Sequence, residues 1–148
     1  MARRANYRRG VYAERLLEEL LYSRCYLATR APASKPRKRV VRPDVLAACA
    51  ERCVAFEVKR GERVNLDRGA LERLAVAAER AGCTAILAYY LGRGEWLALD
   101  IRELLEMGVA TLTPRWARGN MRPLDALVPD CCGRERRAAR IEACAAVL

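Results

Sequence analysis

Three ionisable side chains stand where two short apolar runs of this sequence begin and end. Asp44 follows Pro43 at the start of one run, and Glu57-Val58-Lys59 closes the next. Because side chains alternate along a strand, Glu57 and Lys59 would project from one face while Val58 turns to the other. Two adjacent strands would bring Asp44, Glu57 and Lys59 together. Such carboxylates could hold Mg²⁺, which lowers the pKa of bound water and neutralises phosphate charge, so the group suits phosphodiester hydrolysis.

Lys59 is unusual because the chain has 25 arginines and only three lysines. A compact ammonium that can act on water is favoured here over a guanidinium that stays charged. An ordinary alternative remains, because an aspartate at a strand start and a Glu/Lys pair on an exposed strand are common solvated features.

The absence of histidine narrows the possible chemistry. It excludes Ser-His and Cys-His nucleophile pairs, histidine-ligated zinc and histidine acid-base catalysis. Catalysis would have to use carboxylates, lysine, cysteine or tyrosine.

The elements that position these residues follow from the hydrophobic pattern. Apolar residues at helical spacing predict helices over 11–24, 67–81, 101–107 and 134–147, the first preceded by a basic arm. Short β-prone runs predict strands over 25–30, 44–49, 53–59, 84–91 and 95–100, with 44–59 as a hairpin. Residues 31–42 should be an exposed loop, and residues 108–132 extended or loop segments. This order predicts an α/β fold with a mixed central β-sheet flanked by helices.

The positive charge is concentrated in the N-terminal third of the chain. The net charge is +10, and residues 1–42 hold twelve basic and only three acidic residues. Such a basic block favours a polyanionic partner, most commonly a phosphate backbone. A solvated basic surface or a basic tail is the alternative.

Length and apolar content place the chain among ordinary globular domains. Its 148 residues are 53% hydrophobic, enough for one core, and contain neither a membrane-length apolar run nor a signal-peptide core. We therefore expect a soluble protein of the cytoplasm. Of seven cysteines, we expect Cys25, Cys49, Cys53 and Cys83 to be small buried apolar residues, while disulfides stay open for Cys131, Cys132 and Cys144.

Further residues occur in a familiar order around the Asp and Glu-Val-Lys motifs. Glu14 lies in the first predicted helix as Ala-Glu-Arg, followed by Ala28-Thr-Arg-Ala-Pro-Ala-Ser34, and later by a helix and an apolar strand pair with a tryptophan. From about Tyr7 to about Leu105 this arrangement resembles the archaeal Holliday junction resolvases of the PD-(D/E)xK superfamily. The resemblance implies a restriction-endonuclease-like core and a homodimeric, Mg²⁺-dependent endodeoxyribonuclease that resolves four-way DNA junctions by paired nicks.

The resemblance also assigns roles to individual residues. It implies that Mg²⁺ is bound by Glu14, Asp44, Glu57 and Val58, that Lys59 orients or activates water, and that Ser34 lies near the active site. It implies phosphate contacts from Arg15 and Arg30. The basic charge of the arm and the loop predicts further DNA contacts from Arg8, Arg9, Lys35, Arg37, Lys38 and Arg39. The loop departs from the family, with Ala-Pro-Ala in place of a glycine before Ser34.

Two alternative functions remain open for this sequence, and the domain bounds and a dimer surface can also be predicted. The chain could be another nuclease of the superfamily that cuts duplex DNA, of the restriction or repair type, or a non-catalytic nucleic-acid-binding protein with the same fold. We expect residues 1–107 to form the nuclease domain and residues 108–148 an extension packed on it. We expect Leu71, Leu74, Ala75 and Ala78 of the 67–81 helix to be core residues, with close packing of a partner helix as the alternative. For a dimer, this helix and the neighbouring Tyr89-Tyr90 strand are the candidate surface.

Overall fold

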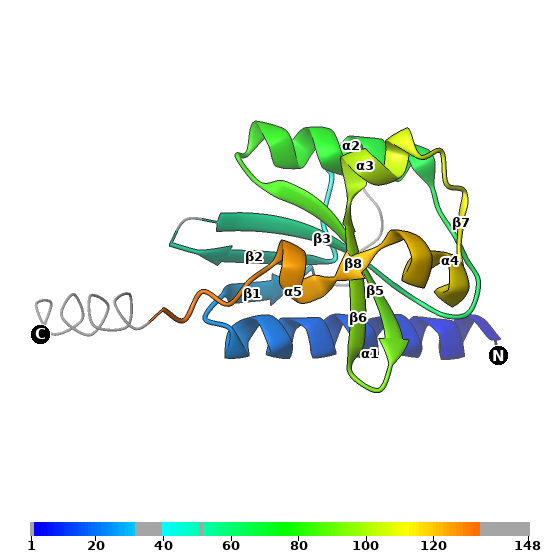
Figure 1. Cartoon of the computed structure of the whole chain (residues 1–148), viewed down its shortest axis with the longest axis horizontal. Helices are drawn as coiled ribbons and strands as arrows, with labels where there is room; N and C mark the ends of the chain where they lie inside the picture. The colour runs from blue at the N-terminus through cyan, green and yellow to red at the C-terminus, as the bar shows by residue number, and fades with distance from the viewer. Residues whose placement is uncertain (1, 32–39, 51, 134–148) are drawn as a thin grey trace, which may run out of the picture.

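A six-stranded mixed β-sheet forms the centre of the computed structural model, which describes residues 2–31, 40–50 and 52–133 (Figure 1). Its strands, in spatial order, are β1 (Leu27–Arg30), β2 (Val45–Cys49), β3 (Arg52–Arg60), β5 (Thr84–Gly92), β6 (Glu95–Asp100) and β8 (Arg122–Pro123). Only β3 and β5 pair in parallel, because a helix connects them and lets the chain cross over. Short β4 (Val64–Asn65) and β7 (Thr111–Leu112) pair separately. The predicted α/β class and mixed sheet are confirmed.

The helix α1 (Ala2–Ser23) covers one face of the sheet (Figure 1). Its residues Ala13, Leu17 and Leu21 are fully buried with Phe56 and Val45 of the sheet. The expected basic arm before residue 11 is wrong, because residues 2–10 already belong to this helix. Residues 2–10 are mostly alanine and arginine, which are good helix formers. The segment has no apolar face, so hydrophobic periodicity could not detect it as helix. No helix in the described ranges has the length and apolar character of a membrane span.

The helices α2 (Arg68–Arg80) and α3 (Ile101–Glu106) lie on the opposite side of the sheet from α1 (Figure 1). Asp67 caps α2 by accepting a hydrogen bond from the Ala70 N–H at 3.1 Å, as expected of an N-cap aspartate. The apolar face of α2 packs on β3 and β5, and its Leu74 is only 4% exposed. Leu71, Ala75 and Ala78 are buried too, so the prediction that this face belongs to the core is confirmed. Since Tyr89 and Tyr90 are buried as well, the candidate dimer surface is wrong: these side chains fill the protomer's own core.

Two short helices, α4 (Pro114–Asn120) and α5 (Leu124–Leu127), occur where extended and loop segments were expected. Thr113 caps α4 by accepting from the Trp116 N–H at 3.2 Å, and Pro114 fits the first turn because its missing N–H would have no helical partner. Leu124, which opens α5, is buried in the core shared with α1. The helix predicted over 134–147 lies outside the described residues.

Six cysteines pair in three disulfides: Cys25–Cys132, Cys49–Cys131 and Cys53–Cys83. The expectation that four of them are unpaired apolar residues is therefore wrong. Their partners are 30 to 107 residues away in the sequence, so no spacing motif marked the pairs. The adjacent Cys131 and Cys132 bond to two different elements, and they join the C-terminal end of the described chain to β2 and to the turn after α1.

Candidate active site

Glu57 and Lys59 lie on one side of β3, as the alternation predicted. The Lys59 Nζ is 2.8 Å from the Glu57 Oε1, and each side chain is about a quarter exposed, 27% and 23% respectively. Asp44 stands directly before β2, and its N–H donates to the Phe56 carbonyl at 2.8 Å, which places it across from Glu57. The β2–β3 pairing therefore brings one basic and two acidic groups together on one face of the sheet.

Asp44 is the most perturbed of these groups. Burial and the nearby charge of Glu57 raise its pKa from 3.8 to about 7, and Glu14 adds to the rise. A hydrogen bond from the Val58 N–H to Oδ2, 2.8 Å long, and the charge of Lys59 act in the opposite direction. The Val58 side chain is buried and apolar, so only its backbone carbonyl could serve as an oxygen ligand.

Glu14 reaches the same site from α1. Burial raises its pKa, the positive charge of Arg30 lowers it, and the charges of Glu57 and Lys59 act on it with opposite signs. Three carboxylates from α1, β3 and the start of β2 are therefore close enough to influence one another. Such a cluster is stabilised by a cation, and hard oxygen donors favour Mg²⁺ over softer metals.

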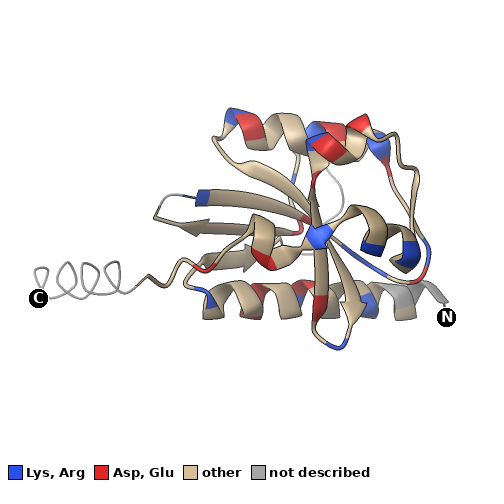
Figure 2. Ribbon diagram, viewed as in Figure 1, with Lys and Arg blue, Asp and Glu red and all other residues tan. Residues whose placement is uncertain are grey.

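The basic residues predicted to bind DNA fall into three groups. Arg8, Arg9 and Arg15 are exposed on α1, a helix along which basic and acidic positions both occur (Figure 2). Arg30 is half-buried: its N–H donates to the Glu18 Oε2 at 3.0 Å and its Nε lies 3.8 Å from the Glu18 Oε1. The remaining predicted residues, Ser34, Lys35, Arg37, Lys38 and Arg39, lie outside the described residues.

Sequence reasoning missed Glu18 as a neighbour of this site. It lies one helical turn after Glu14, where residues four apart share a face. Its contacts with Arg30 join α1 to β1 beside the carboxylate cluster. The Glu14-to-Glu18 spacing was the available signal, but the partner on β1 could not be read from the sequence.

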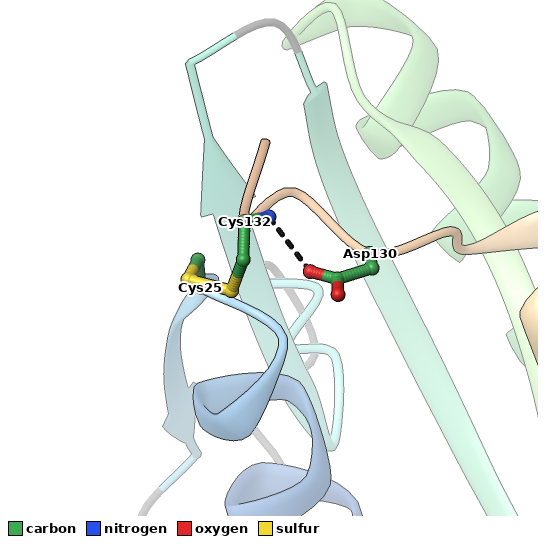
Figure 3. A group of neighbouring side chains, drawn as sticks. All are labelled: Cys25, Asp130 and Cys132. Atoms are coloured by element: carbon green, nitrogen blue, oxygen red, sulfur yellow. Dashed lines mark hydrogen bonds between the residues drawn. A yellow bond between two sulfur atoms is a disulfide. The ribbon is translucent and has the colours of Figure 1, made fainter. Parts of the chain in front are cut away.

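A second cluster of potential ligands lies near the C-terminal end of α1 (Figure 3). The ligand atoms of Cys25, Asp130 and Cys132 are all within 4.8 Å of one another. The two sulfurs are joined in a disulfide, and an Asp130 carboxylate oxygen accepts the Cys132 N–H at 2.7 Å. This group is not the predicted magnesium site, because thiolates favour softer metals and these sulfurs are bonded to each other.

Comparisons with known proteins agree with this fold. Residues 5–113 match the family model described as archaeal Holliday junction resolvase (Hjc). The structure of Archaeoglobus fulgidus Hjc, a Holliday junction resolvase from an archaeal hyperthermophile, aligns with a TM-score of 0.68 and 21% identity over 80% of this chain and 99% of that one. This likeness confirms the restriction-endonuclease-like, PD-(D/E)xK-type core. No functionally curated protein matches the sequence.

Proposed function

The chain belongs to the archaeal Holliday junction resolvase family, and from this premise we propose that it is a Mg²⁺-dependent endodeoxyribonuclease that resolves four-way junctions by paired nicks. The proposed metal dependence rests on one observation: Glu14, Asp44 and Glu57 lie close enough to interact, and the pKa of Asp44 is raised to about 7. Carboxylates that repel one another in a partly buried site form a binding site for a divalent cation.

In the proposed mechanism, Asp44, Glu57, Glu14 and the Val58 carbonyl would hold Mg²⁺. The bound ion would lower the pKa of a water molecule and neutralise charge on the phosphate. The Val58 N–H fixes one Asp44 oxygen, at 2.8 Å, which leaves the other carboxylate oxygen for the metal. Lys59, held 2.8 Å from Glu57, would orient the attacking water and stabilise negative charge that develops on the phosphate.

DNA binding in this proposal uses phosphate contacts and junction shape, with little reading of bases. Arg8, Arg9 and Arg15 are exposed on the helix that also carries Glu14. Arg30 adds a positive charge beside the carboxylates. The loop residues Lys35, Arg37, Lys38 and Arg39 are further proposed DNA contacts, and Ser34 in the same loop is proposed to act near the active site.

We propose a homodimer, because two symmetric cuts in a four-way junction suit a two-fold enzyme. The outer β1–β2 face, defined by Leu27, Thr29, Leu46 and Ala48, is the candidate interface. The strand register places these four exposed residues on one side of the sheet, where β1 pairs with β2. Leu27 is 77% exposed and Leu46 is 40% exposed, and α2 packs on β3 and β5 beside this face. A second copy would bury this apolar surface.

The domain and cellular assignments are also proposals. Residues 1–107 would be the nuclease domain, and residues 108–148 an extension packed on it. The burial of Leu112, Leu124 and Val128 supports such packing for the described part of the extension. The enzyme would act in the cytoplasm.

One assay tests the proposed activity. Labelled four-way junction and a matching linear duplex are incubated with the protein in Mg²⁺ or in chelator, with and without excess unlabelled duplex. We expect paired nicks in the junction only with Mg²⁺, and little competition from the duplex. Cutting of both substrates would instead favour a duplex endonuclease, and metal-independent binding without cutting would favour a non-catalytic DNA-binding protein.

A further inference from the structure

Arg60 lies between two aromatic rings at the end of β3. Its guanidinium carbon is 5.2 Å from the ring centroid of Tyr12 and 5.4 Å from that of Tyr90. Tyr90 is buried on β5, whereas Tyr12 on α1 is 51% exposed. The guanidinium thus has one fixed ring in the core and one ring at the surface.

The inner ring is itself held by two contacts. The rings of Tyr90 and Trp96 are 4.8 Å apart between centroids, and the Tyr90 hydroxyl accepts from the Gly94 N–H at 3.2 Å. A guanidinium placed against such rings is pre-organised, because stacking restricts its plane while its N–H groups remain free to donate.

The charge of Arg60 is not neutralised by an acidic side chain within the described ranges. Lys59, Arg24 and Arg30 each have a carboxylate within 4.0 Å, and so do three surface arginines, Arg68, Arg102 and Arg118. Arg60 instead has aromatic partners. Aromatic rings stabilise the cation and leave its positive charge available to an anion.

The position of Arg60 in the fold indicates which anion. Side chains alternate along β3, so Arg60 projects on the α1 side of the sheet, where it meets Tyr12, while Glu57 and Lys59 project on the other side. The helix α1 links the two, because Tyr12 precedes Glu14 by two residues and Glu14 is close enough to feel the charges of Glu57 and Lys59. A DNA strand that is cut at the carboxylate cluster and passes along α1 would therefore bring one of its phosphates near Arg60.

We propose that Arg60, clamped between Tyr12 and Tyr90, binds a backbone phosphate of the cut strand on the α1 side of the site and so positions that strand. This inference rests on the proposed junction-cleaving function and adds a DNA-binding group outside the motifs that define the site. Tyr12 acts through Arg60, as a positioning residue.

The test measures junction binding against salt concentration in chelator, and single-turnover cleavage in Mg²⁺. The variants are Arg60→Ala, Arg60→Lys, Tyr12→Ala and Tyr12→Phe. Arg52→Ala is the matched arginine control, because Arg52 is exposed at the opposite end of the same strand. Tyr22→Ala is the matched tyrosine control, since Tyr22 is exposed at the far end of the same helix. Circular dichroism checks that each variant is folded.

Loss of one phosphate contact should reduce the steepness of log K against log salt concentration by about 0.9. When salt is raised from about 50 to about 200 mM, the affinity of Arg60→Ala for the junction should therefore fall by a factor about 3.5-fold smaller than the factor for the wild type. Arg60→Lys and Tyr12→Ala should keep the slope and bind more weakly, because the charge remains but its geometry is lost. Tyr12→Phe should match the wild type, as should both controls.

An Arg60→Ala slope equal to that of Arg52→Ala would overturn the proposal. Tyr12→Ala behaving like Tyr22→Ala would overturn the role of the ring clamp. A wild type that neither binds nor cuts junctions would instead reject the proposed function, so the two failures can be told apart.

Discussion

At the scale of single residues, the pKa of Asp44 shows how strongly the carboxylates of the site repel one another. Its pKa is raised to about 7, first by burial and then by the charges of Glu57 and Glu14. Lys59 offsets part of this repulsion but contacts Glu57 at 2.8 Å. The negative charge of the site therefore exceeds its positive charge when all three carboxylates are ionised, and a bound divalent cation would balance it.

The pH dependence of stability follows from that pKa. Between about pH 4 and about pH 7 native Asp44 keeps a proton that the unfolded chain has lost, so in chelator its contribution to the free energy of unfolding falls as pH rises, and levels off above pH 7. Mg²⁺ binds the ionised carboxylate, so the rise in the protein's Tm on adding Mg²⁺ should be larger at pH 8 than at pH 6. Thermal unfolding at both pH values measures this difference. Asp44→Asn should abolish it and the exposed control Glu106→Gln should keep it; an equal shift at both pH values would contradict the prediction.

Substitutions of the site residues should reduce DNA cleavage without reducing DNA binding. Asp44→Asn and Lys59→Ala should each lower single-turnover cleavage by at least about 100-fold, as expected when a group that stabilises transition-state charge is removed. Junction affinity should stay within a few-fold, because binding rests on the arginines of α1 and on the loop. Glu106→Gln again serves as control. Activity within a few-fold of wild type in either variant would remove that residue from the mechanism.

At the scale of elements, the β2–β3 hairpin could be predicted from the sequence. The start of α1 and the short helices α4 and α5 could not. Asp44 and Glu57-Val58-Lys59 border apolar runs of strand length, so alternation and adjacency placed them together. The start of α1 was hidden because residues 2–10 are polar and lack the apolar face that periodicity detects. The α4 helix has a capping threonine and Pro114, but its seven residues give too short a period to recognise.

The disulfides are an element-scale feature with a direct chemical test. Alkylation under denaturing conditions should label at least six more thiols after reduction, two for each of the three bridges. Replacing both Cys49 and Cys131 by serine should lower the free energy of unfolding by about 2–4 kcal/mol, because that bridge closes a long loop in the unfolded chain. Denaturant unfolding measures the change, with Cys144→Ser as control. No gain in labelled thiols on reduction would contradict the pairing.

At the scale of the whole molecule, sequence reasoning located the candidate site but chose the wrong surface for assembly. The candidate catalytic residues are local in sequence or lie on paired strands, so the order of the motifs was enough to group them. An amphipathic helix such as α2 does not reveal whether its apolar face meets its own sheet or a second copy. The exposed Leu27 and Leu46 gave no signal, because alternation in short strands does not say which face is covered.

The proposed homodimer makes the last prediction. Sedimentation at micromolar concentration should give about twice the chain mass of 16.6 kDa. Leu46→Glu should shift the protein to monomer, because a charge on the outer β1–β2 face would be buried without a partner in the dimer. The monomer should cut one strand of a junction without the coordinated second cut. A cruciform plasmid measures this, since paired cuts give linear product and single cuts give nicked circles.

Two further variants separate this interface from other surfaces. Met107→Glu changes an exposed apolar residue after α3, 50% exposed, and should leave both the dimer and paired cutting unchanged. Leu74→Glu places a charge in the protomer core and should unfold the chain, which a loss of the circular dichroism signal would report. A dimeric Leu46→Glu protein would reject this face, and a monomeric wild type that still makes paired cuts would reject the dimer itself.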